Sequence, residues 1–594
     1  MSEKNERLPS HKELEKELSS YLTEKYGDRI KIVSPEGFPE KEPLDQDGSD
    51  KKRKKGRAGI NFSVKPEELE AFLDQYIVCQ ADAKGVLSTK ICTHFNRIRY
   101  AQEHPEAEES IVGGIKNNIL LIGPTGVGKT YIIKLIANRI GVPFIKCDAT
   151  KFSETGYVGG DVEDIIRDLV REANDDIELA ECGIVYIDEI DKIAGNQHLM
   201  GPDVSRSGVQ RALLKPMEET EVDLKTPHDP ISMLQEIEHY RKTGKREKRT
   251  VNTRNILFIM SGAFNDLAEI IMKRVRDREI GFGGSVTRND DKTSFLKYTK
   301  SQDLIQFGFE SEFIGRIPVV SVLERLSEED LYTILKNPNN PIILSKKRDF
   351  MAYGIQIKFE DSALSLLAKK AFLEQTGARG LVSAMERTLL NFEKRLPSTE
   401  IRKLAVTEDV ARYPQRELDA LLAGLSDGKW DEIFERIEKE EKGAVNAYLA
   451  ENKTDLSERC GLSLSESRLD LIALYYACHE VDVMTTIEKI KIIFAQIRQL
   501  EVYFTKSNSI QITFDDRACD VIATMITEST RTFGEFYKAL KEGLEYGLRI
   551  IQEETGKQEF ILTPESLLSP EEYLDGMMKA ASADDMEMDS DQRE

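Results

Sequence analysis

Short apolar runs alternate with amphipathic segments between residues 62 and 325. Four of the runs read NILLI, PFIKC, GIVYID and NILFIM, and the amphipathic segments include YIIKLIANRI, VEDIIRDLVREAN and GVQRALLKPME. Short continuous apolar runs are typical of strands buried on both faces, as in a parallel sheet whose crossover connections are helices. The pattern therefore predicts an α/β domain at 62–325, with a parallel sheet flanked by helices.

The chain becomes mainly helical beyond residue 325. Residues 326–412 contain one strand-like piece, Ile355–Phe359, among helical segments, and this predicts a small helical domain. Residues 413–504 carry amphipathic stretches such as LDALLAGL and KIKIIFAQIRQLEVYF, whose apolar positions are spaced as in helices. We therefore expect a helical extension after the small domain.

An internal repeat connects the small domain with the C-terminal part of the chain. IQIKFED at 355–361 is echoed by IQITFDD at 510–516, and helical segments follow both. Further along, LAVT at 404–407 resembles ILTP at 561–564. These matches predict a degenerate second copy of the small domain at 505–580. Chance similarity between two strand–helix segments is the alternative.

The two ends of the chain are polar. Residues 1–61 are interpreted as an N-terminal segment and a charged linker, because DQDGSDKKRKKGRAG, at about 46–59, is glycine-containing and its charges occur in blocks. The basic run of this linker is expected to be solvated, with contact to nucleic acid or an acidic partner as the alternative. Residues 581–594 are rich in acidic side chains and predict a disordered tail.

Composition limits the class of protein. A chain of 594 residues is too long for one hydrophobic core, and 40% hydrophobic with 32% charged residues fits a soluble globular protein. A net charge of −22 argues against a general nucleic-acid binder. The sequence contains no apolar run of about 18 residues, no signal peptide and no CxxC pair among its seven cysteines. We expect a cytoplasmic protein without membrane or nucleic-acid partners.

A glycine-rich motif, GPTGVGKT, lies between the apolar run NILLI and a helix-like segment. Glycines let the backbone curl so that its N–H groups point at phosphate oxygens, and the lysine adds a positive charge near the β- and γ-phosphates. The threonine hydroxyl can bind Mg²⁺. The motif predicts a phosphate-binding loop made of Gly123, Pro124, Thr125, Gly126, Val127, Gly128, Lys129 and Thr130.

A short apolar strand downstream, IVYI, ends in Asp188 and Glu189. In a phosphate-loop enzyme the first acid holds the Mg²⁺ shell and the second polarises the attacking water. A buried strand that merely ends in solvated acids is the alternative, but the phosphate loop upstream favours the enzyme. The two motifs together predict ATP hydrolysis with ATP and Mg²⁺ as cofactors.

Three further motifs narrow the class of ATPase. Tyr157 and Val158 lie between glycines, where a mobile loop tip could grip an extended chain. Arg316, in EFIGRIP, follows the α/β part and could reach the γ-phosphate of a neighbouring subunit. Arg379, in TGARG, opens a helix of the small domain and could contact phosphates of its own subunit. Taken alone, the three fit a turn with a buried tyrosine, a surface salt bridge and a solvated arginine.

Taken in order, the motifs of residues 62–410 resemble the ClpX family of AAA+ protein-unfolding ATPases. The resemblance rests on FLDQYIVCQADAKGVL, GPTGVGKT, GYVGGDVEDIIRDL, IVYIDEIDKI, SGVQRALLKPMEET, EFIGRIPVV and TGARGL. It implies that Tyr76, Ile77 and Val78 cradle adenine. The sister family HslU shares GYVG, but EFIGRIPVV and the Ile-Gly-Phe motif described below favour ClpX. In the resemblance the further site residues are the pore-loop pair Tyr157 and Val158, the γ-phosphate sensor Ser261, the trans arginine finger Arg316 and the cis sensor Arg379.

An Ile-Gly-Phe motif, formed by Ile280, Gly281 and Phe282, lies in a polar, glycine-bearing segment. An exposed apolar tripeptide in such a segment suits a weak contact made many times over. In the resembled family this loop docks into hydrophobic clefts of a ClpP-like peptidase. Local packing of the isoleucine and the phenylalanine is the alternative.

The resemblance implies a homo-hexameric ring that unfolds tagged or unfolded protein substrates and feeds them to a ClpP-like peptidase. A peptidase-independent remodelling ATPase and a nucleotide-gated scaffold protein are the alternatives. The chain departs from the family in four places. No cysteine precedes Cys79, so the usual four-cysteine zinc domain is not expected, and Cys79 itself stands in the adenine segment where glycine is usual. The basic pore-entrance loop is replaced by a longer stretch at 226–251, and residues beyond about 415 have no counterpart.

Overall fold

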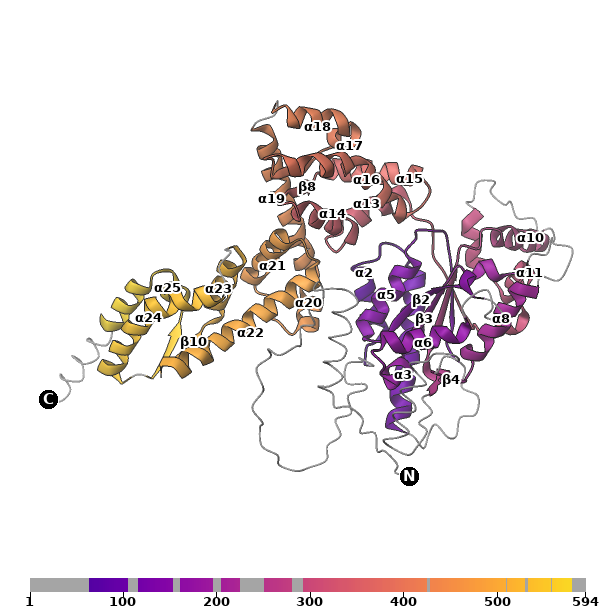
Figure 1. Cartoon of the computed structure of the whole chain (residues 1–594), viewed down its shortest axis with the longest axis horizontal. Coiled ribbons are helices and arrows are strands. Elements are labelled where there is room, and N and C mark those ends of the chain that lie inside the picture. The colour runs from indigo at the N-terminus through magenta and orange to yellow at the C-terminus, as the bar shows by residue number, and fades with distance from the viewer. Residues whose placement is uncertain are drawn as a thin grey trace, which may run out of the picture. The chain divides into compact units, whose positions relative to one another are not determined.

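The computed structural model describes ten stretches of the chain (Figure 1). They are residues 63–104, 116–152, 161–195, 204–224, 250–279, 292–424, 428–508, 510–528, 533–556 and 558–579. Within these stretches, no helix is both long and apolar enough to cross a membrane.

A five-stranded parallel sheet forms the centre of the first domain, with strand order β2-β3-β6-β1-β7. The predicted α/β fold class is therefore confirmed. Four strands coincide with the four apolar runs; β7, which the sequence analysis did not identify, pairs with β1 in the register Ile119↔Val319. The strands are β1 (Ile119–Ile122), β2 (Phe144–Asp148), β3 (Ile184–Asp188), β6 (Leu257–Gly262) and β7 (Val319–Val322).

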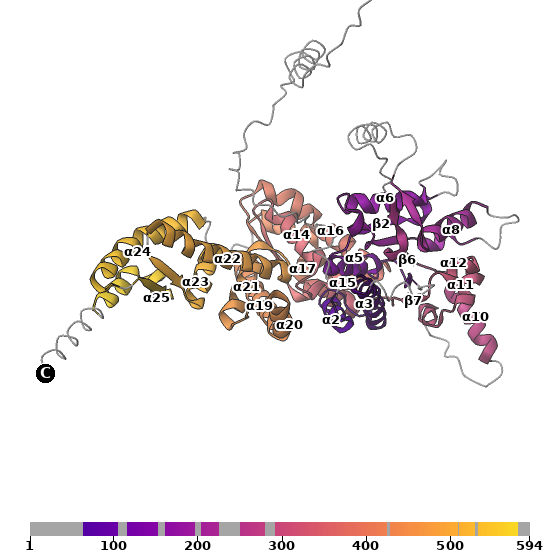
Figure 2. The same ribbon diagram turned by 90° about the horizontal axis from the view of Figure 1, so that it is seen from below.

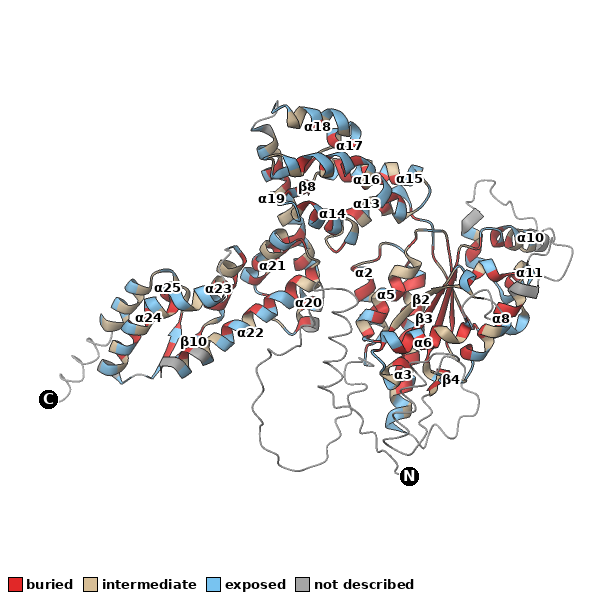
Figure 3. Ribbon diagram, viewed as in Figure 1, coloured by how far each residue is buried: buried red, intermediate tan, exposed pale blue. Residues whose placement is uncertain are grey.

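Helices cover both faces of this sheet because its side chains alternate between two cores. In β1, Ile119 and Leu121 belong to one core, which includes residues of α2, α3 and α5. Leu120 and Ile122 belong to the other core, which includes residues of α6, α8 and α10. The central strands β1, β3 and β6 are buried along almost their whole length, as Figure 3 shows, whereas the edge strand β2 is only partly buried. The helices of this domain are α2 (Pro66–Asp74), α3 (Ala81–Glu103), α5 (Lys129–Ile140), α6 (Val162–Glu172), α7 (Ile177–Ala180), α8 (Val204–Met217), α10 (Leu267–Glu279), α11 (Ser301–Phe307) and α12 (Ser311–Gly315), and a small antiparallel pair joins β4 (Glu221–Asp223) to β5 (Thr250–Asn252).

The next domain is helical, with one pair of parallel strands that includes the predicted strand-like piece. Ser327 caps the first helix by accepting a hydrogen bond from the Asp330 N–H, and Asn340 caps the second from the Ile342 N–H. The Asn340 cap ends the short turn, residues 337–340, that separates the two helices. The elements are α13 (Glu328–Lys336), α14 (Pro341–Met351), β8 (Gln356–Phe359), α15 (Asp361–Leu373), α16 (Ala378–Arg395), β9 (Lys403–Val406) and α17 (Glu408–Arg412).

Three helices follow, and the longest of them, α19, contacts both strands of the small domain and also α21. The order helix, helix, strand, helix, helix, strand, helix then recurs, with β10 and β11 again parallel. Figure 2 shows the helices of this later segment, α21–α25, near the C-terminus. In both segments the first helix packs against the helix that follows the first strand. The elements are α18 (Pro414–Leu422), α19 (Lys429–Glu451), α20 (Lys453–Cys460), α21 (Glu466–His479), α22 (Val483–Asn508), β10 (Gln511–Phe514), α23 (Asp516–Glu528), α24 (Phe533–Thr555), β11 (Glu559–Leu562) and α25 (Pro564–Leu568).

The recurring order supports the predicted repeat and also extends it upstream. Helices α21 and α22 stand where α13 and α14 stand in the small domain, so the shared pattern begins near residue 466 rather than 505. The hydrophobic core of the later segment includes Ile512, Ala518 and Phe560, and it continues into α19 and α20 and to Leu344 of α14. We propose that α21–α25 is a degenerate second copy of the small domain.

Candidate nucleotide-binding site

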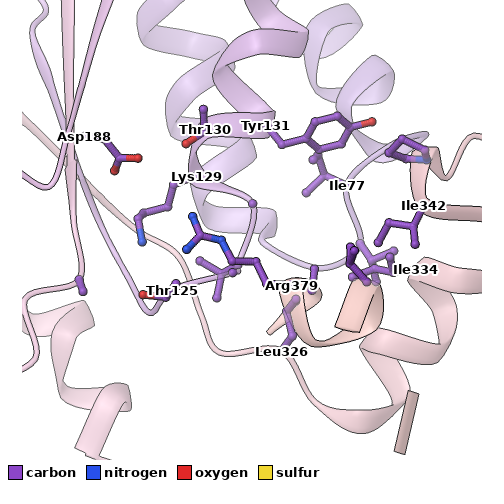
Figure 4. A pocket seen from close by; sticks show the side chains of 18 of the residues that line it. Ile77, Thr125, Lys129, Thr130, Tyr131, Asp188, Leu326, Ile334, Ile342 and Arg379 are labelled. Atoms are coloured by element: carbon purple, nitrogen blue, oxygen red, sulfur yellow. The ribbon is translucent and has the colours of Figure 1, made fainter. Parts of the chain in front are cut away.

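A cavity of about 500 Å³ lies between the phosphate loop and the small domain (Figure 4). Its walls combine charged and apolar side chains, as expected for a site that binds phosphates at one end and a flat ring at the other. The predicted residues on its wall are Ile77, Val78, Thr125, Gly126, Val127, Gly128, Lys129, Thr130, Asp188, Glu189 and Arg379, together with Tyr76.

The phosphate loop joins the end of β1 to the start of α5. Gly126 and Gly128 have φ values of 81° and 96°, in the left-handed region that only glycine adopts without strain. The Lys129 ammonium donates to the carbonyl oxygens of Gly123 and Pro124, at 2.6 and 2.8 Å. Burial lowers the pKa of Lys129 to about 8. A nearby anion would therefore be stabilising for this buried cation.

A backbone contact ties this loop to the small domain, and the sequence analysis did not predict it. The Ala378 N–H, at the start of α16, donates to the Gly126 carbonyl oxygen at 2.9 Å. A Cβ atom on Gly126 would lie 2.0 Å from the Thr376 carbonyl oxygen, and one on Gly377 would lie 2.7 Å from the Gly126 oxygen. Only glycine fits at both positions. The contact places Arg379 on the cavity wall, where Figure 4 shows its guanidinium directed toward Lys129.

The two predicted acids, Asp188 and Glu189, lie where strand β3 ends, and both line the cavity. Asp188 accepts hydrogen bonds from the Ser261 hydroxyl at 2.6 Å and from the Glu189 N–H at 3.1 Å. Burial opposes its ionisation, but hydrogen bonds from Lys146 and Ser261 outweigh burial and lower the pKa of Asp188. Glu189 has φ 58°, a left-handed value for a non-glycine residue, and its side chain is exposed. The chain thus turns sharply after β3, so that Asp188 is hydrogen-bonded and Glu189 is accessible to solvent.

Lys146 of β2 is a residue of this site that the sequence analysis missed. Its ammonium lies 2.7 Å from an Asp188 carboxylate oxygen and 3.4 Å from the Thr130 hydroxyl. A positive group therefore already lies between the two oxygens predicted to bind Mg²⁺. Oxygen donors suit this ion, and one or two from the protein are enough when phosphates and water supply the rest. In the part of the chain that the structure describes, no three His, Cys, Asp or Glu side chains are clustered for metal binding. The donor set fits nucleotide-bound Mg²⁺.

Ser261 lies behind the acids rather than on the cavity wall. It is fully buried on β6, donates to Asp188 and accepts a hydrogen bond from the Tyr186 hydroxyl at 2.7 Å. Tyr186 in turn accepts from the Thr130 hydroxyl at 3.2 Å, so one relay joins the phosphate loop to β3 and β6. The cavity wall beyond β6 includes Asn265, which the sequence analysis also missed.

Arg316 lies outside the cavity of its own chain. It follows α12, its side chain is 54% exposed, and it forms an ion pair with Glu218 at 2.6 Å. This surface position leaves it accessible to a neighbouring molecule. Tyr157 and Val158, and the motif of Ile280, Gly281 and Phe282, lie outside the described residues.

Comparison with known proteins agrees with a nucleotide-binding domain followed by a small helical domain. Residues 115–320 match the AAA domain (Cdc48 subfamily), and residues 326–398 match the C-terminal, D2-small domain of ClpB protein. The chain is 42% identical over 347 residues to the ATP-dependent Clp protease ATP-binding subunit ClpX of Borrelia duttonii, which covers 58% of this chain and 77% of the relative. The same subunit of Borrelia recurrentis matches equally, and that of Treponema denticola is 39% identical over 342 residues, 57% of this chain and 79% of the relative.

These matches extend over the phosphate loop, the two acids and the small domain, and they confirm that the protein is an ATPase. On that similarity, the chain belongs to the ClpX family of AAA+ ATPases.

Proposed function

We propose that the protein is an ATP-dependent unfoldase and translocase that works as a homo-hexamer and feeds protein substrates to a ClpP-like peptidase. The observation that carries the proposal is the bond between Gly126 and Ala378, because it couples the phosphate loop directly to the small domain. A change at the phosphates would then change the relation between the two domains. Such a coupling is what conversion of hydrolysis into mechanical work requires.

Within one subunit, the loop N–H groups and Lys129 hold the phosphates of ATP. Thr130 and Asp188 would hold Mg²⁺, which when bound neutralises charge on the phosphate oxygens. Glu189 is exposed on the cavity wall, where its carboxylate can orient a water and take its proton. Ser261 keeps Asp188 ionised and in place through its hydrogen bond.

Two arginines complete the proposed site from different directions. Arg379 acts on the phosphates of its own subunit, since it lies on the cavity wall. Arg316 acts on the γ-phosphate of the neighbouring subunit, which fits its accessible position outside its own cavity. Such an arginine finger contributes about 10³–10⁵ in rate, so an isolated subunit should hydrolyse ATP very slowly.

The substrate and peptidase contacts rest on the family resemblance. Tyr157 and Val158 would grip the substrate chain in the pore, and Ile280, Gly281 and Phe282 would dock on the peptidase. The relatives are named as subunits of the ATP-dependent Clp protease.

One observation favours a second candidate, a remodelling ATPase that acts without a peptidase. The matches to these relatives cover 57–58% of this chain, while helices α19–α25 share a hydrophobic core that lies almost entirely within the C-terminal part of the chain. A folded region of that size could select one complex for disassembly.

The deciding experiment is ATP-dependent degradation of a stably folded fluorescent protein with an unstructured tail, in the presence of the ClpP-type peptidase of the same organism. Phe282→Ala is assayed beside the wild type. Loss of fluorescence that needs ATP, peptidase and Phe282 would support the proposal. ATP turnover with loss of fluorescence but no cleavage would favour the remodeller, and turnover without either would contradict unfolding of this substrate class.

A further inference from the structure

The C-terminal region, defined here as residues 414–579, reaches the nucleotide cavity at one turn of the small domain. We propose that it positions the adenine-binding wall through Asn339 and thereby sets the affinity for nucleotide. This inference rests on the proposed assignment of the cavity to ATP, with residues 75–78 (the base segment) against adenine. Asn339 acts as a positioning residue, because it contacts other protein groups and positions the base segment through them.

The turn between α13 and α14 contacts the base segment. Asn337 and Asn340 both line the cavity, as do Pro341 and Ile342 at the start of α14. The Asn337 side-chain amide donates to the Gln75 carbonyl oxygen at 2.8 Å. Since Gln75 directly precedes the residues on the cavity wall, its carbonyl oxygen fixes where the wall begins.

Asn339, in the same turn, links this wall to the C-terminal region. Its side chain is buried, and its amide nitrogen lies 3.4 Å from the Gln75 carbonyl oxygen and 2.9 Å from the hydroxyl of Tyr448 in α19. Its amide oxygen accepts a hydrogen bond from the N–H of Val483, at the start of α22, at 3.1 Å. One amide group is therefore shared between the base segment and two helices of the C-terminal region.

Additional contacts join the two regions at this turn. The Tyr476 hydroxyl, on α21, donates to the Pro338 carbonyl oxygen at 3.1 Å. The Arg348 guanidinium, on α14, donates to the carbonyl oxygen of Glu480 at 2.8 Å. Glu480 and Asp482 lie in the turn between α21 and α22, so this turn is also attached to the small domain.

A buried cluster of four charges anchors the C-terminal region to the small domain. Lys347 and Lys358 come from α14 and β8, and Glu441 and Glu480 come from α19 and the end of α21. The Lys358–Glu441 distance is 2.8 Å, the Lys347–Glu480 distance is 3.2 Å, and Lys347 also pairs with Glu441. The two positive and two negative charges of the cluster balance. Moving the C-terminal region away from the small domain would leave buried charges without partners, which is energetically costly. The region is thus held in register with the turn that supports the cavity.

The test is the affinity for a fluorescent ADP analogue in Tyr448→Phe, Asn339→Asp and the double variant. Tyr448→Phe removes one hydroxyl and keeps the ring, while an aspartate at 339 cannot donate to the Gln75 carbonyl oxygen. Tyr546→Phe is the matched control, because that tyrosine is 77% exposed on α24. We expect each single variant to raise the Kd about fivefold, the value of one net hydrogen bond, with the ATPase kcat within about twofold of wild type.

Because both changes act on one shared group, the double variant should be less than additive. Amide hydrogen exchange gives an independent readout: ADP should protect the turn around Asp482 in the wild type and less so in Tyr448→Phe, since coupling between two sites is reciprocal. An unchanged Kd in both single variants, with wild-type ADP binding intact, would overturn the inference even if melting temperatures fall. Absence of ADP binding in the wild type would instead overturn the assignment of the cavity.

Discussion

The small domain and the later segment α21–α25 share one order of elements but meet the nucleotide cavity in different ways. In the small domain, α16 begins beside Gly377 and brings Arg379 to the phosphate loop. In the later segment, α24 begins at Phe533 and has Glu535, an acid, in its first turn. The later segment has no phosphate loop of its own. The comparison teaches that two segments with the same order of elements can differ in whether they contribute a side chain to the nucleotide cavity.

The corresponding turns of the two segments also differ. The α13–α14 turn carries asparagines whose amides bond to the base segment and to the C-terminal region. The α21–α22 turn carries Glu480 and Asp482, and Glu480 is directed into the buried cluster with the small domain. One turn therefore faces the nucleotide cavity, and the other faces the domain that forms it.

The largest expected effect is on ATP turnover, at the nucleotide cavity that the small domain contacts. Glu189→Gln should retain ATP binding but lower steady-state turnover about a hundredfold or more, because an amide cannot take a proton from water. A coupled ATPase assay and equilibrium binding measure the two quantities. Glu545→Gln, on α24 of the later segment, is the control and should leave turnover unchanged. Normal turnover in Glu189→Gln would remove the assigned role.

The next largest effect is on stability, because it disrupts the buried charge cluster that joins the small domain to the C-terminal region. Glu441→Gln leaves Lys347 and Lys358, each 2% exposed, without a full counter-charge, and should lower the free energy of unfolding by about 3 kcal/mol. Urea denaturation followed by far-UV circular dichroism measures the change. Glu542→Gln, from an exposed pair on α24, is the control and should cost under about 1 kcal/mol. Equal stability of the two variants would contradict a structural role for the buried cluster.

A paired substitution compares the helix starts of the two segments directly. Arg379→Ala should lower ATP turnover at least about tenfold, since it removes one cation from the phosphate end of the cavity. Glu535→Ala, in the first turn of α24, should change turnover less than about twofold. Both are measured in the same ATPase assay. A comparable loss in the two variants would mean that the later segment acts on nucleotide after all.

The smallest effect concerns proton uptake at the phosphate loop. Burial lowers the pKa of Lys129 to about 8, and phosphate oxygens favour its protonated form, so binding takes up a proton near and above that pH. The affinity for ADP should be flat below pH 7 and fall as the pH rises past about 8, by at most about tenfold per unit. Calorimetry at pH 8 in buffers of different ionisation enthalpy measures the uptake. Lys129→Arg stays charged and should show none; a wild type without uptake would contradict the prediction.

Local motifs carried most of what the sequence could predict. The phosphate loop, the two acids and the apolar runs are each written within a few neighbouring residues, so the fold class and the ATPase activity followed from them. Strand β7 was missed because Val319–Val322 directly follows the arginine motif, and its apolar residues were interpreted as part of that motif. The contacts of Lys146 and Asn339 could not be predicted, because each joins segments far apart in the sequence whose register only folding determines.

The ammonium of Lys146 has a consequence for how a metal ion enters the site. Its bonds to Asp188 and Thr130 mean that the protein supplies its own counter-ion to these oxygens. Mg²⁺ bound with nucleotide would need the oxygens that this ammonium contacts, so Lys146 would lose its bonds to Asp188 and Thr130. Occupancy of the metal position would be visible as increased reactivity of a single lysine toward amine-labelling reagents, which makes this side chain a built-in chemical reporter.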